Sequence, residues 1–269
     1  MKSIAPWSLF AAAALLAACG DGTAPGSSVA IKFGTAAPGA SPASLLASAP
    51  MGASAAQGLM ITGTNGTLDI TDIRVIVEEF ELEPVEVADC DVEPEPAACA
   101  DFEARYFFID VPLTGSPVTV VQENIPAGMY DELEFEVDDI EVDADDPEEL
   151  ADADLIEALF NEVRAVFPDW PEKASMVVVG SFTPTGGSAV NFRAYFEAEI
   201  EVEFDLIPPL EVTEEGLSRE LVVQLSPDVW FLQGDGTVMD LSQFDFPTTS
   251  QLIDFELEIE DGFDLEIET

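Results

Sequence analysis

The chain contains no histidine, and its 8 lysine and arginine residues face 55 aspartate and glutamate residues, which gives a formal net charge of −47. Without histidine, Ser-His-Asp catalysis, Cys-His catalysis and His-ligated zinc are excluded. The negative charge also makes nucleic acids and anionic lipid headgroups unfavourable partners, because both are bound through positive side chains. The apolar fraction is nevertheless 48%, so the composition predicts a folded protein and not a disordered polyanion.

Long hydrophobic runs are scarce, and the one at the N-terminus is short. It lies within residues 1–18, after Met1 and Lys2, and has the length of an export signal and not of a membrane span. It ends in Leu16-Ala17-Ala18-Cys19, which resembles the lipobox of bacterial lipoproteins. The resemblance implies cleavage before Cys19, a diacylglycerol on its sulfur, and a cell-envelope protein held to the membrane through its lipid anchor only.

The residues after Cys19 indicate which membrane holds the protein and how the folded domain is linked to it. Gly20 stands where an aspartate favours inner-membrane retention in enterobacterial lipoproteins, so the resemblance favours the outer membrane. Residues 19–27 are small and polar, which predicts a flexible tether. The alternative for the N-terminus is an ordinary signal peptide cut after Ala18, which would leave a free thiol on Cys19.

Cysteine is rare, with only Cys90 and Cys99 beyond Cys19. Two thiols of an exported chain usually pair in an oxidising compartment, so we expect a Cys90–Cys99 disulfide that closes a short acidic connection. Such a loop contributes about 2.5 to 3 kcal/mol in the chain-entropy model. Metal ligation by the two cysteines is a weaker alternative.

Strict alternation of apolar and polar residues dominates the rest of the sequence and predicts strands. Val29, Ile31 and Phe33 begin the series, and residues 35–57, rich in Ala, Ser and Pro, are expected to form a mobile loop. The longest alternation places apolar residues at every second position from Val190 to Leu206. At about 3.3 Å per residue this segment exceeds most strands, so we expect it to bend from one sheet into the other.

One segment has helical spacing instead. Asp146 is a candidate N-cap, Pro147 follows it, and an apolar repeat runs to Phe167 ahead of Pro168: Leu155, Ile156, Leu159, Phe160, Val163, Val166 and Phe167. The predicted fold is mainly β: one antiparallel β-sandwich domain over residues 28–269, with about ten strands and one inserted amphipathic helix at about 146–167 laid on a sheet.

The acids fall on the polar positions of the strands. Glu132, Glu134 and Glu136 share one face, as do the acids of Glu197–Glu203 and the group Asp254, Glu256, Glu258 and Glu260. Like charges directly across a ladder destabilise it, and salt screens them. Two interpretations follow: adaptation to a saline environment, or binding of calcium, which prefers six to eight oxygen ligands.

The densest acidic cluster of the sequence is the predicted calcium site. It comprises Asp138, Asp139, Asp143, Asp145 and Asp146, in the connection from a strand to the helix. The cluster lacks the glycine and the spaced glutamate of an EF-hand loop, and helix capping alone could account for Asp146. Asp235 and Asp240 form a second candidate, for which the alternative is a simple hairpin turn at Gly234-Asp235-Gly236.

Residues that would identify an enzyme are missing: there is no nucleophile motif, phosphate-binding loop or cofactor fingerprint, and we predict no catalytic residue. A hydrolase that uses paired carboxylates remains the alternative function, most simply a carbohydrate-active one. It would need an acid of raised pKa in an aromatic-lined cleft. Trp170, Trp230, Tyr106 and Tyr195 could line such a cleft, or they could belong to the core.

Two segments, Phe108–Leu113 and Ile125–Leu133, resemble an uncharacterised group of bacterial envelope lipoproteins with a Pro-Ala-Gly-x-Tyr turn. The resemblance covers residues 60–142 and, loosely, the C-terminal third, and it implies fold and location only. We expect Gly128 to supply a positive φ and Tyr130 to anchor the turn. The predicted function is therefore a binding or scaffolding protein of the cell envelope, with a glycan, a partner protein or calcium as its ligand.

Overall fold

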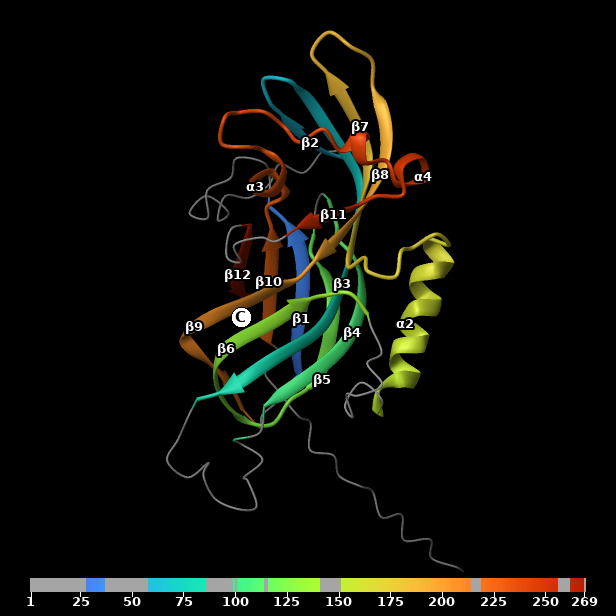
Figure 1. Ribbon diagram of the computed structural model, residues 1–269. Helices are drawn as coiled ribbons and strands as arrows, with labels where there is room; N and C mark the ends of the chain where they lie inside the picture. The colour runs from blue at the N-terminus through green and yellow to red at the C-terminus, as the bar shows by residue number, and fades with distance from the viewer. Residues whose placement is uncertain are drawn as a thin grey trace, which may run out of the picture.

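Strands make up most of the computed structural model, which describes residues 28–36, 58–85, 99, 101–113, 116–140, 151–213, 219–255 and 262–268. They form two sheets that pack face to face around one apolar layer, as Figure 1 shows. This confirms the predicted β-sandwich. The predicted signal peptide and tether lie outside the described residues, as does most of the predicted 35–57 loop. Thr35 itself is the last residue of the first strand, where it pairs with Leu225.

The smaller sheet has four strands. Its order is β12 (Phe263–Glu268), β10 (Arg219–Leu225), β1 (Ser28–Thr35) and β5 (Val118–Asn124). The β1–β10 pair is parallel, whereas β5 and β12 pair antiparallel to their neighbours. The alternation of Val29, Ile31 and Phe33 was enough to predict β1 but not its central position, since a residue pattern does not specify the neighbouring strand.

The larger sheet has eight strands. Its main order is β11 (Leu252–Phe255), β8 (Val190–Ala198), β7 (Met176–Pro184), β3 (Gly66–Pro84), β6 (Gly128–Val137) and β9 (Ile200–Val212). On the other side of β3 lie β2 (Leu59–Thr62) and β4 (Phe102–Asp110). The β8–β11 pair is the second parallel pair, so the sandwich is mixed and not purely antiparallel.

The long alternation from Val190 to Leu206 does form extended chain, broken at Glu199 into β8 and β9. The expected change of sheet is wrong, because both strands belong to the eight-stranded sheet. The reason lies in β3: β7 pairs with its first half and β6 with its second, so these two strands lie end to end. The chain of β8 and β9 then follows them in turn, along β7 first and along β6 next.

The main core lies between the sheets, where the apolar half of each alternation meets. Phe33 of the small sheet packs edge-on against Phe80 and Phe135 of the large one, with ring centroids 5.8 Å and 5.7 Å apart. Phe192, Phe196 and Ile200 are buried as the alternation requires, and Phe204 packs partly buried against the same layer. The polar half of these strands is therefore on the outer faces.

A helix covers part of the outer face of the large sheet. This helix, α2 (Ala153–Val166), buries Ile156, Leu159 and Val163 in a second core that includes Tyr195 of β8. The amphipathic helix is thus confirmed over these residues, with Asp152 as its N-cap; the proposed cap Asp146 lies outside the described residues. Leu155 and Val166, expected on the apolar face, are instead 54% and 46% exposed.

The remaining helices are short. Two of them, η2 (Leu241–Phe244) and α4 (Phe246–Thr249), contact β8 of the large sheet, and α3 (Pro227–Phe231) follows β10 of the small sheet. None of the helices in the described part of the chain combines the length and apolarity needed to cross a bilayer. In Figure 1, α2 lies at one side of the large sheet beside β4, and no helix of the described chain lies over β6 and β9.

The Pro-Ala-Gly-x-Tyr segment leads into β6 and shows how its tyrosine acts. Tyr130 is fully buried, and its hydroxyl donates a hydrogen bond to the carbonyl of Pro126 over 3.0 Å. The predicted anchoring role is therefore present. The positive φ expected at Gly128 is absent: Gly128 is the first residue of β6 and pairs with Val212 as ordinary strand.

Candidate functional site

Acidic side chains form a grid on the outer face of the large sheet, in the part that α2 leaves uncovered. Each of three neighbouring strands contributes three acids, and we call the set the carboxylate face. Its members are Glu79, Glu81 and Glu83 of β3, Glu132, Glu134 and Glu136 of β6, and Glu201, Glu203 and Asp205 of β9.

The register of the strands lines these acids up in rows. Glu134 of β6 is directly opposite Glu81 on one side and Glu203 on the other. The rows above and below it also consist of three acids each: Glu136 pairs with Glu79 and Glu201, and Glu132 pairs with Glu83 and Asp205. Side chains directly opposite each other have Cβ atoms about 5 Å apart, so each facing pair repels by roughly 1 kcal/mol in a water-like dielectric.

Positive charge reaches this face at one corner. Arg105 of β4 places its Nε 3.0 Å from the Oε1 of Glu79 and its Nη2 3.4 Å from the Oε2 of Glu103. Within the described residues no lysine or arginine forms an ion pair with Glu81, Glu132, Glu134 or Glu203. The centre of the grid therefore carries repulsion that the described chain does not neutralise.

Burial and, after it, this repulsion shift the pKa values of the central acids. Partial burial, then the charge of Glu201 and a hydrogen bond with it, raise the pKa of Glu134 from 4.5 to about 7. Burial and neighbouring carboxylates also raise the pKa of Glu81, Glu132 and Glu136. With a pKa of about 7, Glu134 exchanges a proton near neutrality, and a nearby cation would favour its ionised form.

Two triads on this face have the spacing of a cation site. Glu81, Glu83 and Glu134 each offer a carboxylate oxygen, and the three oxygens lie within 4.8 Å of one another; Glu132, Glu134 and Glu203 do the same. Glu134 belongs to both. Calcium accepts bidentate carboxylates and completes its shell with water, so three acids on an accessible sheet face supply a suitable part of its six to eight oxygens.

A polar hollow of about 450 Å³ continues the carboxylate face at one end. Its lining carries four acids, Glu83, Asp131, Glu132 and Asp205, next to the bulge of β9 at Ile207. No aromatic side chain lines it. The hollow contains several carboxylates, one of which, Glu132, has a raised pKa. It lacks the aromatic walls expected for the alternative carbohydrate-active hydrolase.

The aromatic residues considered for such a cleft belong to the cores. Trp170 and Trp230 are 7% and 8% exposed, and Tyr195 is fully buried. Tyr106 packs partly buried against the second core beside α2. Trp170, Trp230 and Tyr195 therefore act in packing, whereas Tyr106 also lines a hollow of about 490 Å³ together with Asp110 and Glu162.

The cation site predicted from the sequence is only partly visible. Asp138 and Asp139 follow the end of β6, where the amide of Asp139 donates a hydrogen bond to Oδ1 of Asp138. Asp143, Asp145 and Asp146 lie outside the described residues, so that site stays a prediction. Neither triad of the carboxylate face includes any of these aspartates.

The second predicted pair has local hydrogen bonds that account for both residues. Asp235 accepts hydrogen bonds from the amide and hydroxyl of Thr237 in the turn, at 2.9 Å and 2.6 Å. Asp240 caps η2 and accepts from the amide of Ser242 at 3.1 Å and from Nε2 of Gln243 at 2.9 Å. The structure thus favours the turn-and-cap interpretation for this pair.

Of the three cysteines, Cys99 alone is among the described residues. Cys99 is described and buried, with 7% of its surface exposed. Cys19 and Cys90 lie outside the described residues, so lipidation of Cys19 and the Cys90–Cys99 disulfide remain predictions.

Comparison with known proteins gives one structural neighbour. No family model matches the sequence, and no curated protein matches it. Among solved structures, the chain is similar to MbnP from Methylosinus trichosporium, with 14% sequence identity and a TM-score of 0.33. The similarity covers 73% of this chain and 75% of that one.

Proposed function

We propose that this chain is a lipid-anchored protein of the cell envelope that binds divalent cations, calcium in particular, on its carboxylate face. The observation that supports the cation most directly is the alignment of acids in rows across β3, β6 and β9, with Glu134 shared by two triads. A divalent ion there would replace repulsion between facing acids by attraction to a common charge. The lipobox-like segment at Cys19 supports the location.

Salt adaptation is the competing interpretation, and it predicts a different ion dependence. Screening depends on ionic strength alone, so sodium and calcium at equal ionic strength would stabilise the fold equally. A bound ion adds a stabilisation that grows with its concentration, about 1.4 kcal/mol when the ion is present at about ten times its Kd. For a domain of this size that corresponds to a rise in Tm of about 3 to 6 °C.

The test is thermal melting in sodium, magnesium and calcium at matched ionic strength, monitored by circular dichroism. We expect calcium to raise the Tm beyond sodium, and magnesium to act less, because it requires a stricter octahedral geometry. If millimolar calcium adds nothing to the effect of sodium, cation binding is wrong and salt adaptation explains the acidic surface.

A matched pair of variants locates the ion. The first replaces Glu81, Glu134 and Glu203 by glutamine and removes both triads. The second replaces Glu157, Glu162 and Glu211, which are exposed and lie outside the triads, and so removes the same charge. Calcium should stop stabilising the first variant and keep its effect on the second. Equal loss in both would place calcium in a diffuse ion atmosphere and contradict the proposed site.

A further inference from the structure

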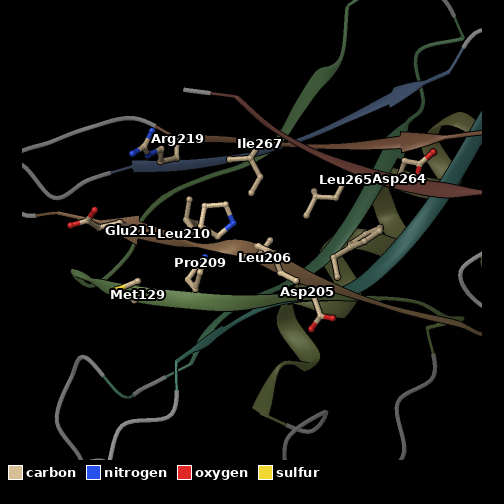
Figure 2. A pocket seen from close by; sticks show the side chains of 13 residues that line it. Met129, Asp205, Leu206, Pro209, Leu210, Glu211, Arg219, Asp264, Leu265 and Ile267 are labelled. Carbon is tan, nitrogen blue, oxygen red and sulfur yellow. The ribbon is translucent and has the colours of Figure 1, made fainter. Parts of the chain in front are cut away.

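The sandwich is open along one side, where the last strand of each sheet faces the other across a cleft. β9 ends the large sheet and β12 ends the small one. Between them lies a cavity of about 820 Å³, called here the edge cleft, whose apolar lining includes Phe204, Leu206 and Leu210 of β9, Leu265 and Ile267 of β12, and Met129 of β6. Figure 2 shows the β12 residues on one side of this cleft and the β9 residues on the other.

The edge cleft exposes side chains that point toward the core layer elsewhere in the sheets. Along β12, Phe263 is 6% exposed, whereas Ile267, on the same face, is 39% exposed. At the mouth of the cleft, Met129 on the outer face of β6 is 49% exposed, and Ile207, at the bulge of β9, is 85% exposed. A gathering of large apolar residues at an opening of the core is typical of a surface that another molecule covers.

The backbone on one side of the cleft is available for strand pairing. β12 pairs with β10, and its other edge pairs with no strand in the described part of the chain. On the opposite side, β9 contains Pro208 and Pro209, and proline has no N–H to donate to a ladder. An added strand would therefore pair with β12 and lie against the apolar wall of β9.

The polar groups of the cleft indicate the chemistry of such a strand. Asp205, Glu211 and Asp264 lie on its lining and favour positive side chains. Arg219, also on the lining, has a buried Nε without a hydrogen-bond partner in the described structure, and such a donor requires an acceptor like a main-chain carbonyl. Figure 2 places Arg219 and Asp264 toward opposite ends of the cleft.

We propose that the edge cleft binds an extended segment of a partner protein in which apolar residues alternate with lysine or arginine. The segment would add a strand to the free edge of β12, insert its apolar side chains between Leu265 and Phe204, and direct its basic side chains to the acidic rim. An anionic amphiphile fits less well, because three acids outnumber the one arginine of the lining. This proposal does not depend on cation binding, since the edge cleft shares Asp205 with the carboxylate face but no member of the two triads.

The probe is a fluorescein-labelled, end-capped peptide in which valine and lysine alternate over eight residues. It is titrated with the protein in the presence of a chelator, and binding is measured by fluorescence anisotropy. A peptide of the same composition with its lysines and valines in separate blocks controls for charge. A third peptide, N-methylated at alternate amides, loses the donors needed for pairing. We expect saturable binding of the alternating peptide at one site, and affinity at least about tenfold lower for both control peptides.

Two charge-matched protein variants test the location. Ile207→Lys with Ile267→Lys places two positive charges in the cleft, and Met60→Lys with Val190→Lys places two on exposed apolar residues of β2 and β8. The first should weaken binding by about tenfold or more, the second by about twofold at most. All four residues are exposed, so folding is retained and is checked by melting. Arg219→Met provides a further variant that should weaken the alternating peptide.

Three outcomes would overturn the proposal. The block and alternating peptides could bind equally, which would show simple charge attraction. The peptide could lose affinity only when Glu81, Glu134 and Glu203 become glutamine, which would place it on the carboxylate face. Sodium decanoate could bind in an Arg219-dependent manner while the peptide does not, which would make the edge cleft a site for small anionic amphiphiles.

Discussion

Replacing Glu134 by glutamine removes the central charge of the carboxylate face and keeps its shape. Glu134 lies between Glu81 and Glu203 in the ladder, and burial together with Glu201 raises its pKa from 4.5 to about 7. Because the folded-state pKa is above the value in the unfolded chain, the folded protein binds this proton more tightly. Stability should therefore fall as the pH rises from about 4.5 to about 7, and the glutamine variant should lack the part of this fall that comes from Glu134.

The size of the effect follows from the two pKa values. A pKa of about 7 against 4.5 sets an upper bound of about 3 kcal/mol on the cost of ionising Glu134 in the folded state. The side chain is only partly buried, so solvent screens this cost, and we expect about 1 kcal/mol in practice. The variant should then melt about 2 to 4 °C higher than the wild type above neutral pH and at the same temperature below about pH 4.

The assay is thermal melting across this pH range in sodium chloride with a chelator. Glu211→Gln is the matched control, because Glu211 lies on β9 but faces Met129 across the ladder and not another acid. A gain for Glu134→Gln that is independent of pH, or that the control reproduces, would refute the pKa argument. Repeating the melts in calcium adds a second condition: the gain should shrink or reverse, since Glu134 would then be an ion ligand.

Three further predictions concern the fold and the anchor. Val163→Ala should cost about 1 to 3 kcal/mol, because this fully buried residue holds α2 to the sheet, whereas Leu155→Ala on the exposed side should change the denaturant midpoint little. Tyr130→Phe removes the hydrogen bond to Pro126 and should lower stability by about 1 kcal/mol in urea unfolding, and an unchanged midpoint would show that the hydroxyl is not an anchor. Cys19→Ala should release the protein from the membrane fraction of expressing cells, as seen by immunoblotting; continued membrane association would contradict lipidation at this residue.

The faces of the strands could be predicted from the sequence, but their partners could not. Alternation assigned Phe192, Phe196 and Ile200 to the interior, and all three are buried. The same pattern is compatible with any neighbouring strand, so it did not reveal that β7 and β6 lie end to end along β3. For this reason the expected change of sheet within residues 190–206 was wrong, and the parallel pairing of β1 with β10 was not foreseen.

The candidate site was missed for a related reason. The sequence shows that Glu132, Glu134 and Glu136 lie on one face of their strand, and it shows the same for the acids of the long strand. Within one strand, however, each set looks like an ordinary solvated face. The facing of Glu134 with both Glu81 and Glu203 depends on register between segments far apart in the sequence. The number of acids per stretch of sequence is highest around Asp138 and Asp139, which is why the sequence predicts the cation site there instead. Acids at every second position on several strands were the available signal for a shared face.

The central place of β1 has a mechanical consequence. Its backbone is hydrogen-bonded to β10 on one side and to β5 on the other, over most of its length. If the chain ahead of Ser28 is the link to a membrane and a ligand is held elsewhere on the sandwich, tension enters the fold along this strand. Pulling β1 out of the sheet would then require the hydrogen bonds to β10 and to β5 to break together in shear, and not one after another. Under that condition, the N-terminal strand would be well suited to resist force.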